Sequence, residues 1–329
     1  MQIPDFISKA LSETMNQKIA EYIADGLSIN EIQNSLDKEV ESEIDQLIET
    51  TSSSYVENFK NVMYPNILQE RNTAKAFIAN NIDSVWQEGF VASESMYLIV
   101  LEMASQFNAI FRELSPNETR GKEFRYYVLK ELHGRACQQY LEILELLKGG
   151  FADGAYARWR SLYEICVIAD FIQMNDDKVA KRYFEESFDD KGKNEWAKSA
   201  PCFSTYKHVT LADIKKQCEF YGELWKDQYR LANKVVHASP EETFNRLGVS
   251  PDTRKRIIPV GRTNYGLASP AINSAISLCH ITTFFFRLVT RGDTVVYIRA
   301  LTKWVDYIQK VYLEIEKSCL STNSSDDTP

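Results

Sequence analysis

Four polar residues in the second half of the chain have the types and spacing to act on a phosphodiester. Arg230, Asn233, Lys234 and His237 occupy positions i, i+3, i+4 and i+7, so a helix would place them on one face. Arginine offers a planar, permanently charged fork that suits phosphate, and histidine exchanges protons near neutral pH. This set, called the polar stripe below, predicts RNA cleavage without a metal ion. His237 would move protons at the ribose 2′-OH or the leaving oxygen, and Arg230 would stabilise the charged phosphate.

The same spacing also fits a solvent-facing helix that has no catalytic role. On spacing alone this reading is favoured, because a histidine in the last turn of a helix is stabilised by the helix dipole. Ser239-Pro240 then predicts the start of a new helix, and Glu242 completes a capping box with Ser239.

A second candidate lies in the segment Arg158–Glu164. Arg160 and Glu164 are four residues apart and can pair on a helix. The surrounding helix is apolar over much of its surface, which predicts a central position and partial burial of these charges. They would form a structural ion pair, the favoured reading, or brace the polar stripe.

A third candidate is the basic segment Arg254, Lys255 and Arg256, together with Arg262. These side chains follow the polar stripe closely in sequence and could contact phosphates. A short run of charge is more often a solvated loop, and that alternative is favoured.

Metal and cofactor sites are not expected. His133, His208 and His280 have no metal-ligand spacing, and the six cysteines form no C-x-x-C pair. Nucleotide-binding glycine patterns and the nucleophile-elbow motif are also missing. A pocket lined by the many Tyr and Phe residues stays open as a further alternative.

Composition predicts an all-α protein. The 329 residues are 44% hydrophobic but include only 13 Gly and 9 Pro, too few for a turn-rich β-fold. Residues 1–50 hold 3 basic and 11 acidic residues, which accounts for the whole net charge of −8. With no signal-peptide pattern and no apolar run of about 18 residues, we expect a cytoplasmic protein that does not enter a membrane.

Apolar periodicity predicts a multi-helix bundle in three parts: an acidic N-terminal helical region (1–80), a helical body (81–319) and a disordered tail (320–329). We expect breaks at the Thr/Ser run 50–54 and at Pro65. The predicted helices cover 3–24, 29–48, 55–80, 82–114, 123–148, 151–175, 210–237, 240–247, 270–291 and 293–319. Residues 189–209 read as a loop, and 256–260 give the only hint of a strand.

Two resemblances add to these patterns. The segment from Gly149 to Glu164, followed by Tyr229 to Pro240, resembles a bacterial all-helical family of unknown function over roughly residues 125–290. Separately, Arg230 and His237 are similar to the R-x4-6-H motif of HEPN ribonucleases, although Leu231 stands where HEPN proteins often have a polar residue. The second resemblance implies an all-α domain in toxin–antitoxin or anti-phage systems, with Arg and His acting at a dimer cleft.

The leading hypothesis is therefore a HEPN-like, metal-independent endoribonuclease with RNA as substrate, which acts as a homodimer. His237 and Arg230 would be catalytic, with Asn233, Lys234, Arg160 and Glu164 in support. The alternative is a non-catalytic interaction module, in which Arg160, Glu164 and His237 form a structural network. In that case the acidic N-terminal helices would bind a protein partner.

Overall fold

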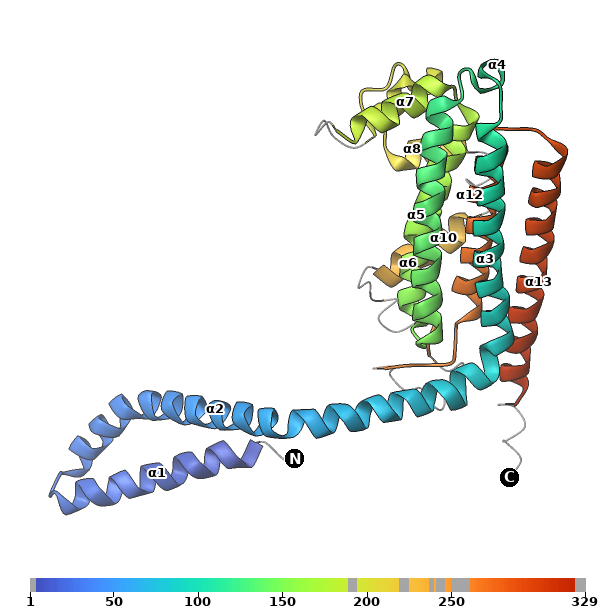
Figure 1. Cartoon of the computed structure of the whole chain (residues 1–329). Coiled ribbons are helices and arrows are strands. Elements are labelled where there is room, and N and C mark those ends of the chain that lie inside the picture. The colour runs from blue at the N-terminus through green and yellow to red at the C-terminus, as the bar shows by residue number, and fades with distance from the viewer. Residues whose placement is uncertain are drawn as a thin grey trace. The chain divides into compact units, whose positions relative to one another are not determined.

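The computed structural model describes residues 4–188, 194–218, 225–236, 240, 246–249 and 261–322. Across these ranges the chain forms helices and no strand, which confirms the predicted all-α multi-helix bundle (Figure 1). The chain divides into two compact units, Met1–Lys75 and Ala76–Pro329. None of the described helices is long and apolar enough to cross a membrane.

The N-terminal unit consists of α1 (Pro4–Ala24) and most of α2 (Ile29–Phe77). Ser28 and Glu31 form the predicted capping box, in which the Ser28 amide donates to Glu31 at 2.9 Å. The two predicted breaks in this region are wrong, because α2 continues through residues 50–54 and through Pro65. The Ser52 hydroxyl bonds to the Ile48 carbonyl within the helix, and Pro65 removes only one backbone donor from 49 residues.

The body begins with a π-helical segment, η1 (Ile78–Asp83), and continues into α3 (Ser84–Arg112). Its other main helices are α5 (Glu123–Lys148), α6 (Ala152–Met174), α12 (Ala268–Phe286) and α13 (Gly292–Thr322). The short α4 (Pro116–Thr119) starts at a second capping box, formed by Ser115 and Glu118. These positions confirm the predicted long helices, except that α13 extends to Thr322 where a disordered tail was expected from residue 320.

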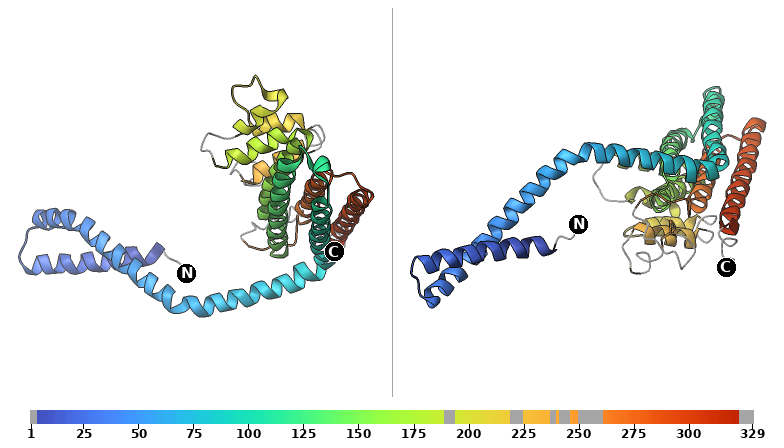
Figure 2. Two further views of the ribbon diagram at one scale, coloured as in Figure 1. Left: turned by 45° about the horizontal axis from the view of Figure 1, so that its top comes forward. Right: turned by 90° about the horizontal axis from the view of Figure 1, so that it is seen from below.

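Helix α12 lies at the centre of the body and packs against α3, α5, α6 and α13 (Figures 1 and 2). Its sequence is apolar on all sides, as expected of a helix surrounded by others. Phe285 meets Phe107 of α3 edge to face, with ring centroids 4.7 Å apart. The buried hydroxyls of Ser277 and Thr282 bond to carbonyls of their own helix, both at 2.8 Å, so they leave no polar group unpaired at these positions.

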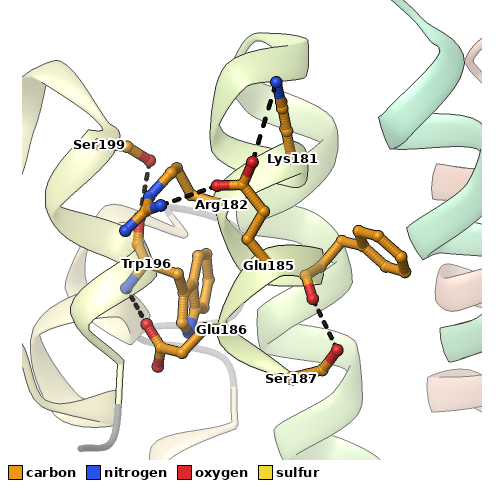
Figure 3. A network of polar contacts seen from close by, with 8 residues as sticks. Lys181, Arg182, Glu185, Glu186, Ser187, Trp196 and Ser199 are labelled. Carbon is orange, nitrogen blue, oxygen red and sulfur yellow. Dashed lines mark hydrogen bonds and ion pairs between the residues drawn. The ribbon is translucent and has the colours of Figure 1, made fainter. Parts of the chain in front are cut away.

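Shorter elements cover one side of α5 and α6. They are α7 (Asp177–Glu186), the 3-10 helices η2 (Glu195–Ser199) and η3 (Pro201–Phe203), α8 (Leu211–Gln217) and α10 (Lys226–Val236). Figure 3 shows how η2 is held to α7, where the Trp196 amide donates to Glu186. The Trp196 ring also meets the Tyr183 ring of α7 edge to face. The region predicted as a loop, 189–209, therefore contains two short helical turns.

The single helix predicted over 210–237 corresponds to α8 and α10. Cys218 ends α8 with non-helical backbone angles (φ −87°, ψ 82°). Most of the helix predicted at 240–247, and the strand hint at 256–260, lie outside the described residues.

Candidate functional site

The described part of the polar stripe lies on α10. Arg230 points to solvent with 71% of its side chain exposed, and its guanidinium is 3.3 Å from the Asp227 carboxylate one turn earlier. Asn233 and Lys234 are half-buried on the same helix. His237, which completes the stripe in sequence, lies outside the described residues. The described part of the stripe therefore presents the long Arg230 side chain to solvent, with the hydrogen-bond donors of Asn233 and Lys234 beside it.

The face of α10 that carries Tyr229, about 100° around the helix from Arg230, is fixed to α6 by a polar contact as well as by packing. The Tyr229 hydroxyl donates to Glu164 at 2.8 Å, and Arg160 donates to the same carboxylate oxygen at 3.2 Å. The hydrogen bond to Tyr229 is the largest influence that raises the pKa of Arg160. Arg160 and Glu164 thus form the predicted i, i+4 pair, and each keeps 30% of its side chain exposed.

A lysine from α8 joins this cluster. The Lys215 ammonium lies 3.6 Å from the centroid of the Tyr229 ring and 4.8 Å from that of Tyr163. A cation over two aromatic faces is attracted by the negative potential of both rings. Lys215 is half-buried, and this burial lowers the pKa of its ammonium group. Glu164, Arg160, Tyr229 and Lys215 therefore join α6, α8 and α10.

A second, more deeply buried contact fixes α10 to α12. The Gln228 side-chain oxygen accepts from the Asn273 amide at 3.0 Å and also from the Tyr156 hydroxyl. Trp159 donates to the Asn273 carbonyl at 3.0 Å. Since three helices share these buried hydrogen bonds, the orientation of α10 about its own axis is specified, and Arg230 is kept on the outer face.

The predicted basic segment is described only at Arg262; Arg254, Lys255 and Arg256 lie outside the described residues. The Arg262 guanidinium donates to the Gly149 carbonyl at 2.6 Å and lies 4.9 Å from the Phe151 ring centroid. Arg262 therefore stabilises the turn between α5 and α6. The described part of the polar stripe lies on α10, whereas Arg262 contacts residues that follow α5.

The described histidines do not form a common site. His133 is buried and lies 3.1 Å from the Thr282 hydroxyl, and burial lowers its pKa to about 4. His208 is exposed and is 3.8 Å from Glu195. Within the described ranges, no three His, Cys, Asp or Glu side chains are grouped so that they could hold a metal ion. Cys166 and Cys279 are buried in the helical core, and neither forms a disulfide bond.

Comparison with protein families gives one match. A model for DUF5677, a family of unknown function, matches residues 126–219, which run from α5 to the end of α8. This confirms a domain of unknown function over that stretch, which is shorter than the expected 125–290. Arg160 and Glu164 lie inside the matched region, whereas Arg230 and His237 lie beyond it. No curated protein and no solved structure matches the chain.

The sequence reading missed several residues of this site. Lys215, Gln228 and Asn273 contact the α6–α10 interface, but they are far apart in sequence and belong to no local motif. Tyr229 lies in the segment that resembles the helical family, and its position directly before Arg230 is the one local signal that the two side chains leave α10 in different directions. A helix that directs Arg230 outward must direct the preceding residue about 100° away from it.

Proposed function

We propose that this protein is a HEPN-like, metal-independent endoribonuclease that acts on RNA in a toxin or anti-phage role. The exposed Arg230 guanidinium is the observation that carries the proposal. It stands on a helix whose other face is tied to α6 and α12 by Tyr229 and Gln228. A cation that is open to solvent, on a helix that is fixed in orientation, can receive a phosphate without a large rearrangement.

In the proposed reaction, His237 removes the proton from a ribose 2′-OH. The 2′ oxygen then bonds to the adjacent phosphorus, and the bond from phosphorus to the 5′ oxygen breaks. A proton returns to the departing 5′ oxygen, so the products are a 2′,3′-cyclic phosphate and a 5′-hydroxyl end. Arg230 stabilises the charge that develops on the non-bridging oxygens.

The remaining predicted residues take supporting roles. Asn233 and Lys234 add donors beside Arg230, while Arg160 and Glu164 hold Tyr229 and with it the position of α10. The phosphate-contacting role predicted for Arg254, Lys255 and Arg256 stays part of the proposal, whereas Arg262 is engaged with Gly149 and Phe151. The HEPN resemblance implies a homodimer in which the two copies share the catalytic cleft. We propose that this dimer acts in the cytoplasm.

The test compares purified wild-type protein with three single variants on a defined single-stranded RNA in EDTA. We expect His237→Ala and Arg230→Ala to lower cleavage by on the order of a hundredfold or more, as for loss of a proton-transfer group or a charge-stabilising donor. Lys310→Ala is the matched control, since Lys310 is an exposed cation of α13 that pairs with a carboxylate of its own helix, as Arg230 does. Its activity should match wild type.

Two further readings make this test specific to the mechanism. A substrate with 2′-deoxyribose at the cleaved position should resist cleavage. The products of the RNA substrate should carry 2′,3′-cyclic phosphate ends. Full activity of His237→Ala, or no cleavage by wild type, would rule out the proposed ribonuclease activity.

A second function is favoured by a separate observation, the apolar surface of α2. Seven of its large apolar side chains are exposed between residues 56 and 68: Val56, Phe59, Val62, Met63, Tyr64, Ile67 and Leu68. Exposed apolar side chains in such number are typical of a protein-interaction surface. On this reading the acidic N-terminal helices bind a protein partner, and the Arg160–Glu164–Tyr229 cluster is structural. The RNA assay separates the two functions.

A further inference from the structure

Four cationic side chains line one cavity in the body, which we call the basic pocket. They are Lys122 and Arg125 at the start of α5, Arg287 just after α12, and Arg291 just before α13. The cavity has a volume of about 460 Å³, and Gln173, from the last turn of α6, also lines it. Figure 1 shows these helix ends together beside α4. Two segments that are distant in sequence, 122–125 and 287–291, thus place like charges around one space.

The charge of this lining is opposite to that of the whole protein. Among the described lining residues Glu118 is the one carboxylate, so four cations and one anion give a formal charge of 4 − 1 = +3. The chain as a whole carries −8. A concave surface of one sign concentrates ions of the other sign, because its walls limit screening by water.

Glu118 neutralises the pocket only in part. It accepts hydrogen bonds from the Ser115 amide and hydroxyl, which lower its pKa, and it lies 3.6 Å from Arg291. Two other carboxylates lie nearby but do not line the cavity. Asp177 caps the start of α5 by accepting from the Arg125 amide at 2.8 Å, and Asp170 is buried on α6 near Arg287.

Arg125 is only partly engaged within the protein. Its Nη2 atom donates to the Gly121 carbonyl at 3.1 Å. Its Nε atom is closed to solvent and has no hydrogen-bond acceptor among the described residues, which costs free energy. The charge and the concave shape of the lining, rather than this closed-off atom, favour an anion in the cavity.

We propose that the basic pocket binds a small anion of the phosphate class, such as pyrophosphate or the phosphate groups of a nucleotide. Arginine suits this ligand because its planar N–H fork matches two phosphate oxygens at once. The site is distinct from the polar stripe. Gln173 lies 13 residues beyond Arg160 on α6, which corresponds to roughly 20 Å at 1.5 Å per residue. Binding here therefore stands or fails independently of ribonuclease activity.

The experiment titrates the full-length protein with sodium pyrophosphate by isothermal calorimetry, in buffer free of phosphate and sulfate. We expect saturable binding by wild type, and about tenfold or greater weakening in Arg125→Gln and in Arg291→Gln, since each loses a charged donor. Glu118→Gln should bind more tightly, because it removes the carboxylate from the lining. Arg299→Gln is the matched control, as Arg299 is an exposed arginine of α13 outside the pocket.

The proposal predicts weaker binding for the two arginine variants of the pocket and tighter binding for Glu118→Gln, so the direction of each change tests it. Arg291 is exposed, so Arg291→Gln keeps the test valid if Arg125→Gln fails to fold; circular dichroism checks each variant. No pyrophosphate binding by wild type overturns the proposal. Equal weakening in Arg299→Gln also overturns it, because it would mean attraction to overall surface charge. The proposal is likewise overturned if a 5′-hydroxyl RNA oligonucleotide binds to wild type while pyrophosphate does not.

Discussion

His133 is an ionisable side chain in the hydrophobic core. It is 4% exposed, lies 3.1 Å from the Thr282 hydroxyl and contacts the Phe285 ring, with centroids 5.5 Å apart. Burial lowers its pKa from 6.5 to about 4. Between these two pH values the unfolded chain binds a proton that the folded protein refuses. The stabilisation is therefore complete above pH 6.5 and is lost as the pH falls through about 4.

We predict that His133→Gln flattens the dependence of stability on pH. The full pKa difference corresponds to about 3 kcal/mol of unfolding free energy, at the conversion of 1.36 kcal/mol per pKa unit. Urea unfolding at pH 7.0 and pH 4.5 measures the effect. Wild type should lose clearly more stability than the variant at the lower pH.

Asp170 changes the pH dependence of stability in the opposite direction, so its effect must be measured separately from that of His133. Burial raises its pKa from 3.8 to about 6, and its stabilising effect is present at low pH and lost as the pH rises through 6. The double variant His133→Gln, Asp170→Asn removes both. Equal pH slopes in wild type and His133→Gln would show that His133 is accessible to protons in the folded protein.

At the scale of elements, Gly150 determines how α5 passes to α6. Its backbone is left-handed (φ +76°), and the Thr263 amide donates to its carbonyl at 3.0 Å. A Cβ atom there would lie 2.8 Å from the Thr263 carbonyl oxygen and 2.7 Å from Ile82. We predict that Gly150→Ala lowers the unfolding free energy by more than about 1 kcal/mol, from backbone strain alone.

Gly134, within α5, is the matched control. Its backbone is helical, and a Cβ there would have no atom within 4 Å. Gly134→Ala should raise the unfolding free energy by roughly 0.5–1 kcal/mol, since alanine favours helix over glycine. Thermal or urea unfolding of both variants gives the comparison, and a stable Gly150→Ala would mean that the turn relaxes without strain.

The helices of the body could be predicted because their signals are local. Gly149-Gly150 ends α5 and the Ser115 capping box begins α4, each as the sequence indicates. The predicted breaks in α2 failed for a related reason. A Ser/Thr run or one proline disfavours helix only locally: the Ser52 hydroxyl bonds to the Ile48 carbonyl of its own helix, and Pro65 removes a single backbone donor.

The candidate site could be predicted only where it depends on spacing within one helix. Arg160 and Glu164 pair as their i, i+4 positions indicate. Lys215 over Tyr229, and Gln228 against Asn273, depend on how helices pack, which no local pattern encodes. The basic pocket is the extreme case, because its four cations come from two segments more than 160 residues apart and form no charge run in the sequence.

At the scale of the whole molecule, charge and core are distributed unequally along the chain. The first 50 residues account for the net charge of −8, and the neutral remainder includes the +3 basic pocket. The buried residues of the described hydrophobic core all lie between Ile82 and Tyr312. The unit Met1–Lys75 therefore contributes acidic surface and exposed apolar side chains rather than core.

This distribution predicts that the body folds without the N-terminal unit. Deleting residues 1–75 removes one described buried apolar side chain, Ile32, and no residue of the core cluster between Ile82 and Tyr312. The fragment 76–329 should therefore unfold cooperatively, within about 3 °C of the main transition of the full chain. Differential scanning calorimetry of both proteins tests this. By contrast, the isolated fragment 1–75 should show a weak, broad transition, because long helices without a packed core depend on marginal local stability. A drop of more than about 10 °C in the body's transition would mean that α2 stabilises the bundle directly, and the acidic unit would then be part of one cooperative fold.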